Sequence, residues 1–246
     1  YYQCDVIDMS IMWIGQPSLQ VTEGGKVGIA YEKFGFLKYA YPHEHLDLFP
    51  SNCGPGDPKT WRCITINDDA NVGSDVQLAF GPTTGRGILY SHGETLGFAQ
   101  YVASNGNCGE DGHNLLKENQ WQCVSFVSLG DESNHSFSID IDSKGYPVIA
   151  YAYAPDDSGP RSLHLSYQNG HIGLEPAYNW QHDVVDPAPN MDVDNGREVS
   201  LALNSWGMGL IAYMQDDNWD DYNPIDRLKI AFQPPIFRVY LPLVVY

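Results

Sequence analysis

The sequence lacks an excess of positive charge. Only 13 Lys and Arg residues stand against 31 Asp and Glu residues, so the formal net charge is −18 at pH 7. A surface this acidic repels phosphate backbones and anionic lipid headgroups, which argues against nucleic-acid binding and against simple attachment to membrane surfaces. The same charge favours solubility and attracts cations.

Long hydrophobic runs are also missing. No apolar stretch approaches the roughly 20 residues that a membrane-spanning helix needs, so no membrane span is predicted. The opening residues have neither the basic start nor the apolar centre of a signal peptide. We interpret the chain either as a mature product or as part of a longer precursor.

Known catalytic motifs are absent too. The sequence has no Gly-x-Ser-x-Gly nucleophile elbow, no phosphate-binding loop and no dinucleotide-binding fingerprint. No segment keeps a helical period beyond two turns, so no long helix is predicted. Aromatic residues make up 13% and charged residues only 18%, a composition typical of a β-rich secreted protein.

What is present is a tripeptide that recurs at a nearly constant distance. Its copies are Tyr2-Gln3-Cys4, Trp61-Arg62-Cys63, Trp121-Gln122-Cys123 and Trp180-Gln181-His182. The third position falls at 4, 63, 123 and 182, in steps of 59, 60 and 59. A fixed period of this length indicates a repeat architecture. We therefore predict a repeat domain over 1–233, with units at about 2–60, 61–120, 121–179 and 180–233, and a C-terminal tail at 234–246.

Each unit predicts four short antiparallel strands. Alternating apolar residues lead into a Gly-containing turn and a nearly all-apolar second strand, which predicts a hairpin. The hairpins are expected at 18–31, 77–90, 138–151 and 200–213. The third strands are expected at 36–41, 96–102, 163–168 and 228–233, and the recurring tripeptide opens the fourth strand.

Four-stranded units with a period of this size predict an all-β protein of the β-propeller type. Four blades of about 60 residues each are visible in the sequence. They would form either a complete ring sealed between the two ends of the chain or part of a larger ring. The alternative is a β-sandwich with coincidental spacing.

One repeat motif reads Ser-Leu-x-x-Asp-x-x-Gly-x-Pro-x-Ile-x-Tyr, followed by Leu-Lys-Tyr-Ala and then Trp. It is clearest in residues 138–151 and 36–41, whereas the other three units lack the Asp and the Pro. The motif resembles the tandem repeats of many secreted bacterial proteins that are predicted to be β-propellers. This resemblance spans most of the chain and implies the propeller fold, but it implies no particular activity, because one fold hosts many functions.

The five cysteines are expected to form two local disulfides. Cys53 and Cys108 each precede a Trp-x-Cys motif, which suggests the pairs Cys53–Cys63 and Cys108–Cys123. Both cysteines of such a pair are missing from the last unit, where His182 replaces the second one, as expected if the two residues act together. Spacings of 10 and 15 residues do not suit a zinc site. Disulfides in turn indicate an oxidising, extracellular or cell-surface location.

Cys4 is left over. Either its partner precedes residue 1 in a longer chain, or Cys4 is unpaired or bonded to another molecule. The tail raises a similar question, since residues 236–246 form the most hydrophobic stretch of the chain with Arg238 as their only charge. Such a segment must be covered, either by its own propeller or by a neighbouring subunit as an added strand. Its last residues also resemble short tails on secreted proteins of filamentous phototrophic bacteria.

Carboxylates occupy one register position just before the first strand of alternate units. This position holds Asp75 and Glu198, which would face each other in a four-bladed ring. Propeller glycosidases use two carboxylates near the central channel, so this pair is the catalytic candidate. Ordinary solvated strand-end residues are the simpler interpretation.

Two stretches are metal candidates. His43 and His45 would share one face of a strand and could hold a transition metal, although Pro42 favours a loop there. Asp216, Asp217, Asp220 and Asp221 form an acidic loop that could bind Ca²⁺, although the spacing is not that of an EF-hand. In that loop Trp219 and Tyr222 could stack on a sugar. Solvated loops are the alternative in both cases, and no other cofactor is expected.

Two functions follow from these observations. The first is a non-catalytic extracellular scaffold, adhesion or assembly module that binds other protein subunits or surface glycans. The second is a carbohydrate-active, glycosidase-like enzyme that uses acidic channel residues. The absence of a recognisable catalytic set favours the first.

Overall fold

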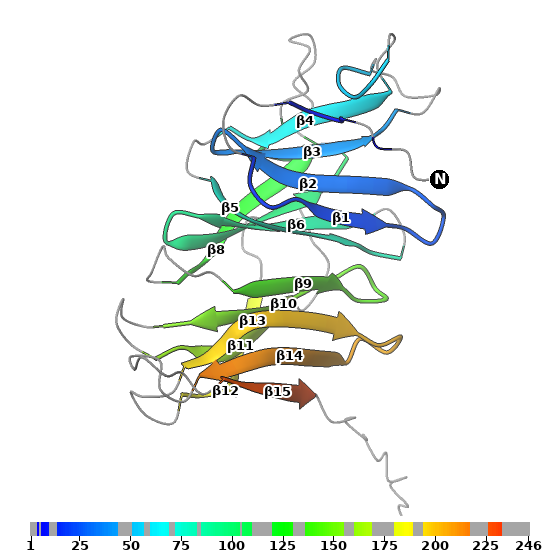
Figure 1. Ribbon diagram of the computed structural model, residues 1–246. Helices are drawn as coiled ribbons and strands as arrows, with labels where there is room; N and C mark the ends of the chain where they lie inside the picture. Colours follow the sequence, from blue (N-terminus) through cyan, green and yellow to red (C-terminus); the bar gives the residue numbers. More distant parts are fainter. Residues whose placement is uncertain are drawn as a thin grey trace, which may run out of the picture.

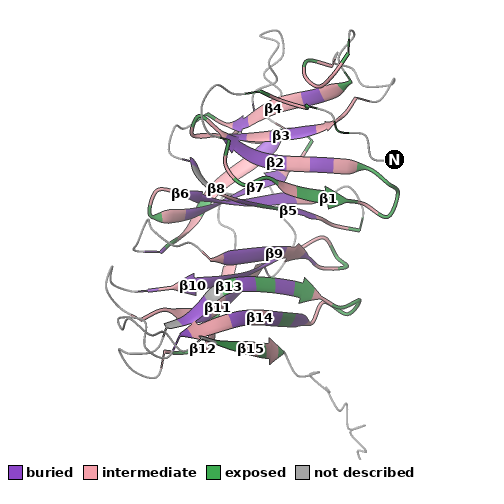
Figure 2. Ribbon diagram, viewed as in Figure 1, coloured by how far each residue is buried: buried purple, intermediate pink, exposed green. Residues whose placement is uncertain are grey.

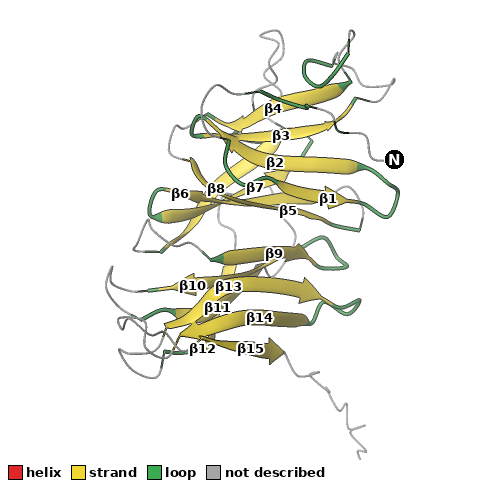
Figure 3. Ribbon diagram, in the orientation of Figure 1, coloured by secondary structure: helices red, strands yellow, loops and turns green. Residues whose placement is uncertain are grey.

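The computed structural model is built from β-strands joined by turns and loops, and its described part contains no helix (Figure 3). The described residues are 4, 6–9, 14–43, 51–56, 60–68, 72–82, 85–103, 105–109, 120–129, 136–154, 160–168, 180–188, 194–216 and 226–232. Within these ranges no helix is long and apolar enough to cross a membrane. The prediction of an all-β protein is therefore confirmed.

The strands of these residues form four antiparallel sheets, each a meander in chain order. The first sheet contains β1 (Ser18–Val21), β2 (Val27–Lys33), β3 (Phe36–Pro42) and β4 (Trp61–Asn67). The second contains β5 (Val72–Phe80), β6 (Arg86–His92), β7 (Thr95–Tyr101) and β8 (Trp121–Ser128). The third contains β9 (Phe137–Ile141), β10 (Pro147–Tyr153), β11 (Ser162–Gln168) and β12 (Trp180–Asp186). The fourth contains β13 (Asp194–Leu203), β14 (Gly209–Asp216) and β15 (Asp226–Phe232).

The hairpins repeat in register as well as in sequence. The apolar residues that face each other across the first two strands are Leu19 and Ile29, Leu78 and Ile88, Ile139 and Ile149, and Leu201 and Ile211. In three of the sheets the connecting turn contains a glycine with φ between 77° and 89°, a region that disfavours side chains with a Cβ. These glycines are Gly25, Gly145 and Gly207. The recurring Gly and the alternating apolar residues therefore place an equivalent apolar pair in the first hairpin of each sheet.

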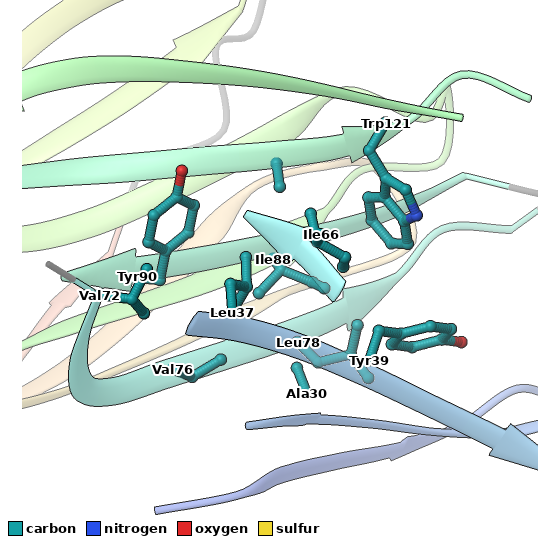
Figure 4. Packing of buried hydrophobic residues seen from close by; sticks show 11 residues of the cluster. Ala30, Leu37, Tyr39, Ile66, Val72, Val76, Leu78, Ile88, Tyr90 and Trp121 are labelled. Carbon is teal, nitrogen blue, oxygen red and sulfur yellow. The ribbon is translucent and has the colours of Figure 1, made fainter. Parts of the chain in front are cut away.

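Consecutive sheets pack face to face and form a stack (Figure 1). The first strands lie next to one another along the stack, since β1 contacts β5, β5 contacts β9 and β9 contacts β13. Three apolar clusters fill the three interfaces between the sheets. Figure 4 shows the first of them, in which Leu37 and Tyr39 from the first sheet meet Leu78 and Trp121 from the second. The core is thus divided into layers, one between each pair of neighbouring sheets.

The two ends of the stack are not joined to each other. Figure 1 shows the first and fourth sheets at opposite ends, so the described residues do not form the closed four-bladed ring that was one of the sequence-based alternatives. The fourth sheet has three strands among the described residues, whereas each of the others has four. Stacked antiparallel sheets of this kind occur in both sandwiches and propellers.

Candidate functional site

The two disulfides fasten equivalent loops. Cys53 is bonded to Cys63 and Cys108 to Cys123, which are the pairs expected from the sequence. Each bond joins the loop after the third strand to the fourth strand of the same sheet. Cys4 is exposed and is not part of a disulfide.

An asparagine next to each loop cysteine adds two hydrogen bonds between the loop and the fourth strand. The Asn52 side chain accepts a hydrogen bond from the Cys63 backbone N–H at 2.7 Å and donates one to the Cys63 carbonyl at 2.8 Å. Asn107 makes the same two bonds to Cys123, at the same distances. The side-chain amide therefore acts as one more residue of the strand ladder. The sequence signal for this contact is the repeated Asn-Cys-Gly, which sequence analysis did not interpret.

The third sheet has a polar and aromatic cluster where the first and second sheets have a disulfide. Ser166 lies 2.6 Å from Nδ1 of His182, the residue that replaces the strand cysteine. The Tyr151 hydroxyl lies 3.3 Å from both groups. The ring of His164 stacks on Tyr151, and its Nε2 lies 2.8 Å from the Ser162 hydroxyl. Ser166 is fully buried, so it is a structural partner of His182 and is inaccessible as a nucleophile.

Burial shifts the pKa of two groups in this cluster. It lowers the pKa of His164, and the electrostatic influence of the nearby His182 acts in the same direction. Burial also raises the pKa of Tyr151, a shift that the hydrogen bond with Ser166 partly offsets. Both groups are therefore neutral at pH 7, as a half-buried aromatic cluster requires.

The two candidate catalytic carboxylates lie in equivalent irregularities of the first strands. Asp75 lies in β5, where the register with β6 shifts, and Glu198 lies in β13, where the register with β14 shifts. Glu198 is exposed and has a φ of 50°. The two residues belong to the second and fourth sheets, which both pack on the third sheet. At the same register position in the third sheet, the Ser136 hydroxyl accepts the Val199 N–H at 2.6 Å, so there the position supports the joint between sheets.

The metal candidates are only partly within the described residues. His43 follows β3, and its backbone N–H donates to the Thr60 carbonyl. Asp216 ends β14 and is buried. Among the described residues no group of three or more His, Cys, Asp or Glu side chains could hold a metal ion. His45, Asp217, Asp220, Asp221, Trp219, Tyr222 and the tail at 234–246 lie outside the described residues.

A tyrosine of the second strand forms a polar joint between sheets. Tyr213 donates to a carboxylate oxygen of Asp186 at the end of β12, and Lys229 forms an ion pair with the same oxygen. Between the first and second sheets, Asn67 at the end of β4 donates to the hydroxyl of Tyr90 at 3.2 Å. In both places the fourth strand of one sheet thus contacts the second-strand tyrosine of the next sheet.

The same contact occurs once more at the N-terminal segment. Tyr31 donates to Asp8 at 2.8 Å, and Lys33 forms an ion pair with that carboxylate at 2.6 Å. Asp8 stands four residues after Cys4, just as Asn67 and Asp186 stand four residues after Cys63 and His182. Burial of the phenol, followed by its bond to the carboxylate, raises the pKa of both Tyr31 and Tyr213, so both hydroxyls stay protonated and donate.

Exposed residues lie on the strands of both end sheets (Figure 2), and several of them are large and apolar. On the fourth sheet these are Leu210, Leu228, Ile230 and Phe232. On the first sheet they include Leu19 and Val21. We refer to these two sets as the fourth-sheet face and the first-sheet face. Contiguous exposed apolar residues usually mark interaction surfaces.

The fold and these surfaces define an all-β protein of repeated antiparallel sheets with two disulfide-fastened loops. No protein-family model matches the chain, and no curated protein matches it either.

Proposed function

We propose that the protein is a non-catalytic extracellular scaffold and assembly module, organised as a β-propeller or as a sector of one. The observation that carries this proposal is the repeated packing of one sheet on the next, together with the exposed apolar face at each end of the stack. Each interior joint has an apolar cluster, and the first and third joints also have polar contacts from the fourth strand to a tyrosine and from a serine to the backbone. Such a stack is rigid and holds its loops and end faces at fixed separations.

The order of the sheets supports the propeller interpretation. In a propeller each blade is a four-stranded antiparallel meander, and the first strands of the blades are neighbours around the axis. Three sheets here have that strand order, and their first strands are in contact along the stack. A sandwich packs two sheets around one core, whereas this protein has three apolar layers.

Two disulfides support an extracellular or cell-surface location, because such bonds persist in oxidising compartments. Other protein subunits or surface glycans are the proposed partners. The apolar tail at 234–246 would then pack on its own sheets or on a neighbouring subunit.

The experiment is a binding and turnover screen with the purified protein. A scaffold should bind at least one class of extracellular protein or glycan, seen as a rise in melting temperature, without hydrolysing any glycan. Hydrolysis that falls more than 100-fold in both Asp75→Asn and Glu198→Gln would replace this proposal with the glycosidase alternative. Melting with Ca²⁺ and with a chelator tests the acidic loop that begins at Asp216, because a bound ion stabilises the folded state.

A further inference from the structure

The fourth-sheet face has the same kinds of apolar side chain as the buried interfaces between sheets, although it is exposed. Two positions of the third strand fill each interior joint from one side. They are Leu37 and Tyr39 in the first sheet, Leu96 and Phe98 in the second, and Leu163 and Leu165 in the third. All six side chains are at most 8% exposed. Their equivalents on the fourth sheet, Leu228 and Ile230, are 71% and 61% exposed. This face therefore has the side chains that cover a following sheet.

The first-sheet face has the complementary composition. A residue of the first strand fills each interior joint from the other side, and these residues are Leu78, Ile139 and Leu201. Their equivalent on the first sheet is Leu19, which is 57% exposed. The chain thus displays one half of a joint at each end of the stack, and the two halves lie far apart in one molecule (Figure 1).

A polar contact found in the first and third interior joints is also present as two separate halves, one at each end of the stack. Ser18 accepts the Leu78 N–H at 2.9 Å, and Ser138 accepts the Leu201 N–H at 3.0 Å. The next serine in this series is Ser200, which is exposed on the fourth sheet. The N–H that would complete it by register is that of Leu19.

The N-terminal segment behaves as a fourth strand that belongs to a preceding sheet. The Ile7 carbonyl accepts the Gly54 N–H at 2.7 Å, just as the Ile66 carbonyl of β4 accepts the Gly109 N–H at 2.8 Å. Asp8 contacts Tyr31, just as Asn67 contacts Tyr90. Residues 6–9 therefore lie on the first sheet as β4 lies on the second.

We propose that the fourth-sheet face binds the first-sheet face of a second copy of this chain, and that the N-terminal segment of that copy adds to β15 as the fourth strand. In the three complete sheets the third-strand Leu is paired with the residue equivalent to Asp8. The register that follows pairs Leu228 with Asp8 of the second copy and Ala231 with Cys4. This inference rests on the proposed function as an assembly module and names its partner.

The contact is head-to-tail, because the two faces are different surfaces of the chain. Two copies that meet at both ends would close a ring of eight sheets, which is within the range of known propellers. Burial of Leu228, Ile230, Phe232 and Leu19 supplies the apolar surface, and strand addition supplies backbone hydrogen bonds.

The first measurement is the mass of the purified chain in solution over a range of concentrations. We expect a dimer, twice the 27.4 kDa of one chain. The variant Ile230→Asp should weaken the association more than tenfold, because it places a charge in the apolar joint. Val184→Asp is the matched control, since Val184 is also exposed on a strand but lies outside both faces. Ile230 is exposed in the single chain, so both variants should keep the wild-type circular dichroism spectrum.

The second measurement reports the register. Directly opposed residues on antiparallel strands have Cα atoms about 4.5–5.5 Å apart, which a disulfide can bridge. Ala231→Cys should therefore form an intermolecular disulfide with the native Cys4, identified by peptide mapping. The bond should be lost when Cys4→Ser is added, and it should form again when that double variant is mixed with wild type. Val184→Cys should form no such bond.

A monomer at all concentrations, or a disulfide that joins position 231 to position 231, would overturn the proposal. The two proposals fail separately. A monomer that still binds other proteins or glycans would contradict only the homotypic joint, whereas glycan hydrolysis by a head-to-tail dimer would contradict only the non-catalytic function.

Discussion

At the scale of single residues, close packing around glycines shows how tightly the sheets fit together. A Cβ on Gly97 would lie 2.3 Å from the ring of Tyr90, which is 3% exposed. Tyr90 belongs to the cluster between the first two sheets, so its ring cannot move aside without opening that layer. The sequence shows Gly97 only as an interruption of an apolar strand, and the ring that requires it becomes visible in the structure.

Gly97→Ala should therefore lower the free energy of unfolding by about 1–3 kcal/mol, the usual cost of overpacking a core. Gly85→Ala is the matched control, because a Cβ there would meet no atom within 4 Å and its φ is not in the left-handed region. Urea unfolding followed by tryptophan fluorescence measures both variants. Equal stabilities of the two variants would contradict the close approach of Tyr90.

His164 should make stability depend on pH. Burial lowers its pKa in the folded protein, so the unfolded chain binds the proton more tightly. Its contribution is fully present above the ordinary histidine pKa of about 6.5 and is lost as pH falls below that value. Comparison of urea midpoints at pH 7.5 and 5.0 should show a larger drop for wild type than for His164→Gln. An equal drop would mean that other groups dominate.

At the scale of elements, strands were easier to predict than the contacts between them. Alternation and turn glycines placed all the hairpins, and the spacing of Cys53 and Cys108 before their partners gave both disulfides. The cluster of Ser166, His182 and Tyr151 was missed, because it depends on which residues oppose each other across three strands. The sequence showed that a disulfide was absent there but not which polar contacts replaced it.

The disulfide loops should contribute to stability mainly through the unfolded chain. Loops of 10 and 15 residues correspond to about 3 kcal/mol each in the chain-entropy description. Replacement of both Cys108 and Cys123 by Ser should therefore lower the free energy of unfolding by about this amount. Asn107→Ala should lower the free energy of unfolding by about 1 kcal/mol or more, because it removes two hydrogen bonds to Cys123. Denaturant unfolding of the single and double replacements measures both effects.

At the scale of the whole molecule, the period of about 60 residues predicted the repeated antiparallel sheets but not what lies at the two ends of their stack. Each layer needs side chains from two sheets, so the repeat explains the three interior interfaces. The same repeat gives Leu228 and Ile230 the apolar pattern of the buried third-strand residues in the other sheets, yet both are exposed. Exposure depends on which sheet is the neighbour, and this information is not contained in a single unit.

The joint between the third and fourth sheets has a distinctive polar ladder. Val199, Leu201 and Leu203 of β13 donate their backbone N–H groups to side chains of Ser136, Ser138 and Asp140, respectively. These acceptors stand two residues apart, as side chains on one face of a strand do. These hydrogen bonds fasten the fourth sheet to the third, because they supply acceptors for backbone N–H groups along the edge of β13.

Loss of two acceptors, in the variant Ser138→Ala with Asp140→Ala, should loosen the fourth sheet selectively. In a stack of repeats each sheet is stabilised by its neighbours, so the end sheet should open before the interior ones. Hydrogen exchange should become more than tenfold faster at the amides of Leu201 and Leu203, while those of Ile88 and Leu89 in the second sheet keep their protection. Equal acceleration in both places would mean that the stack unfolds as one cooperative unit, with no local opening at its end.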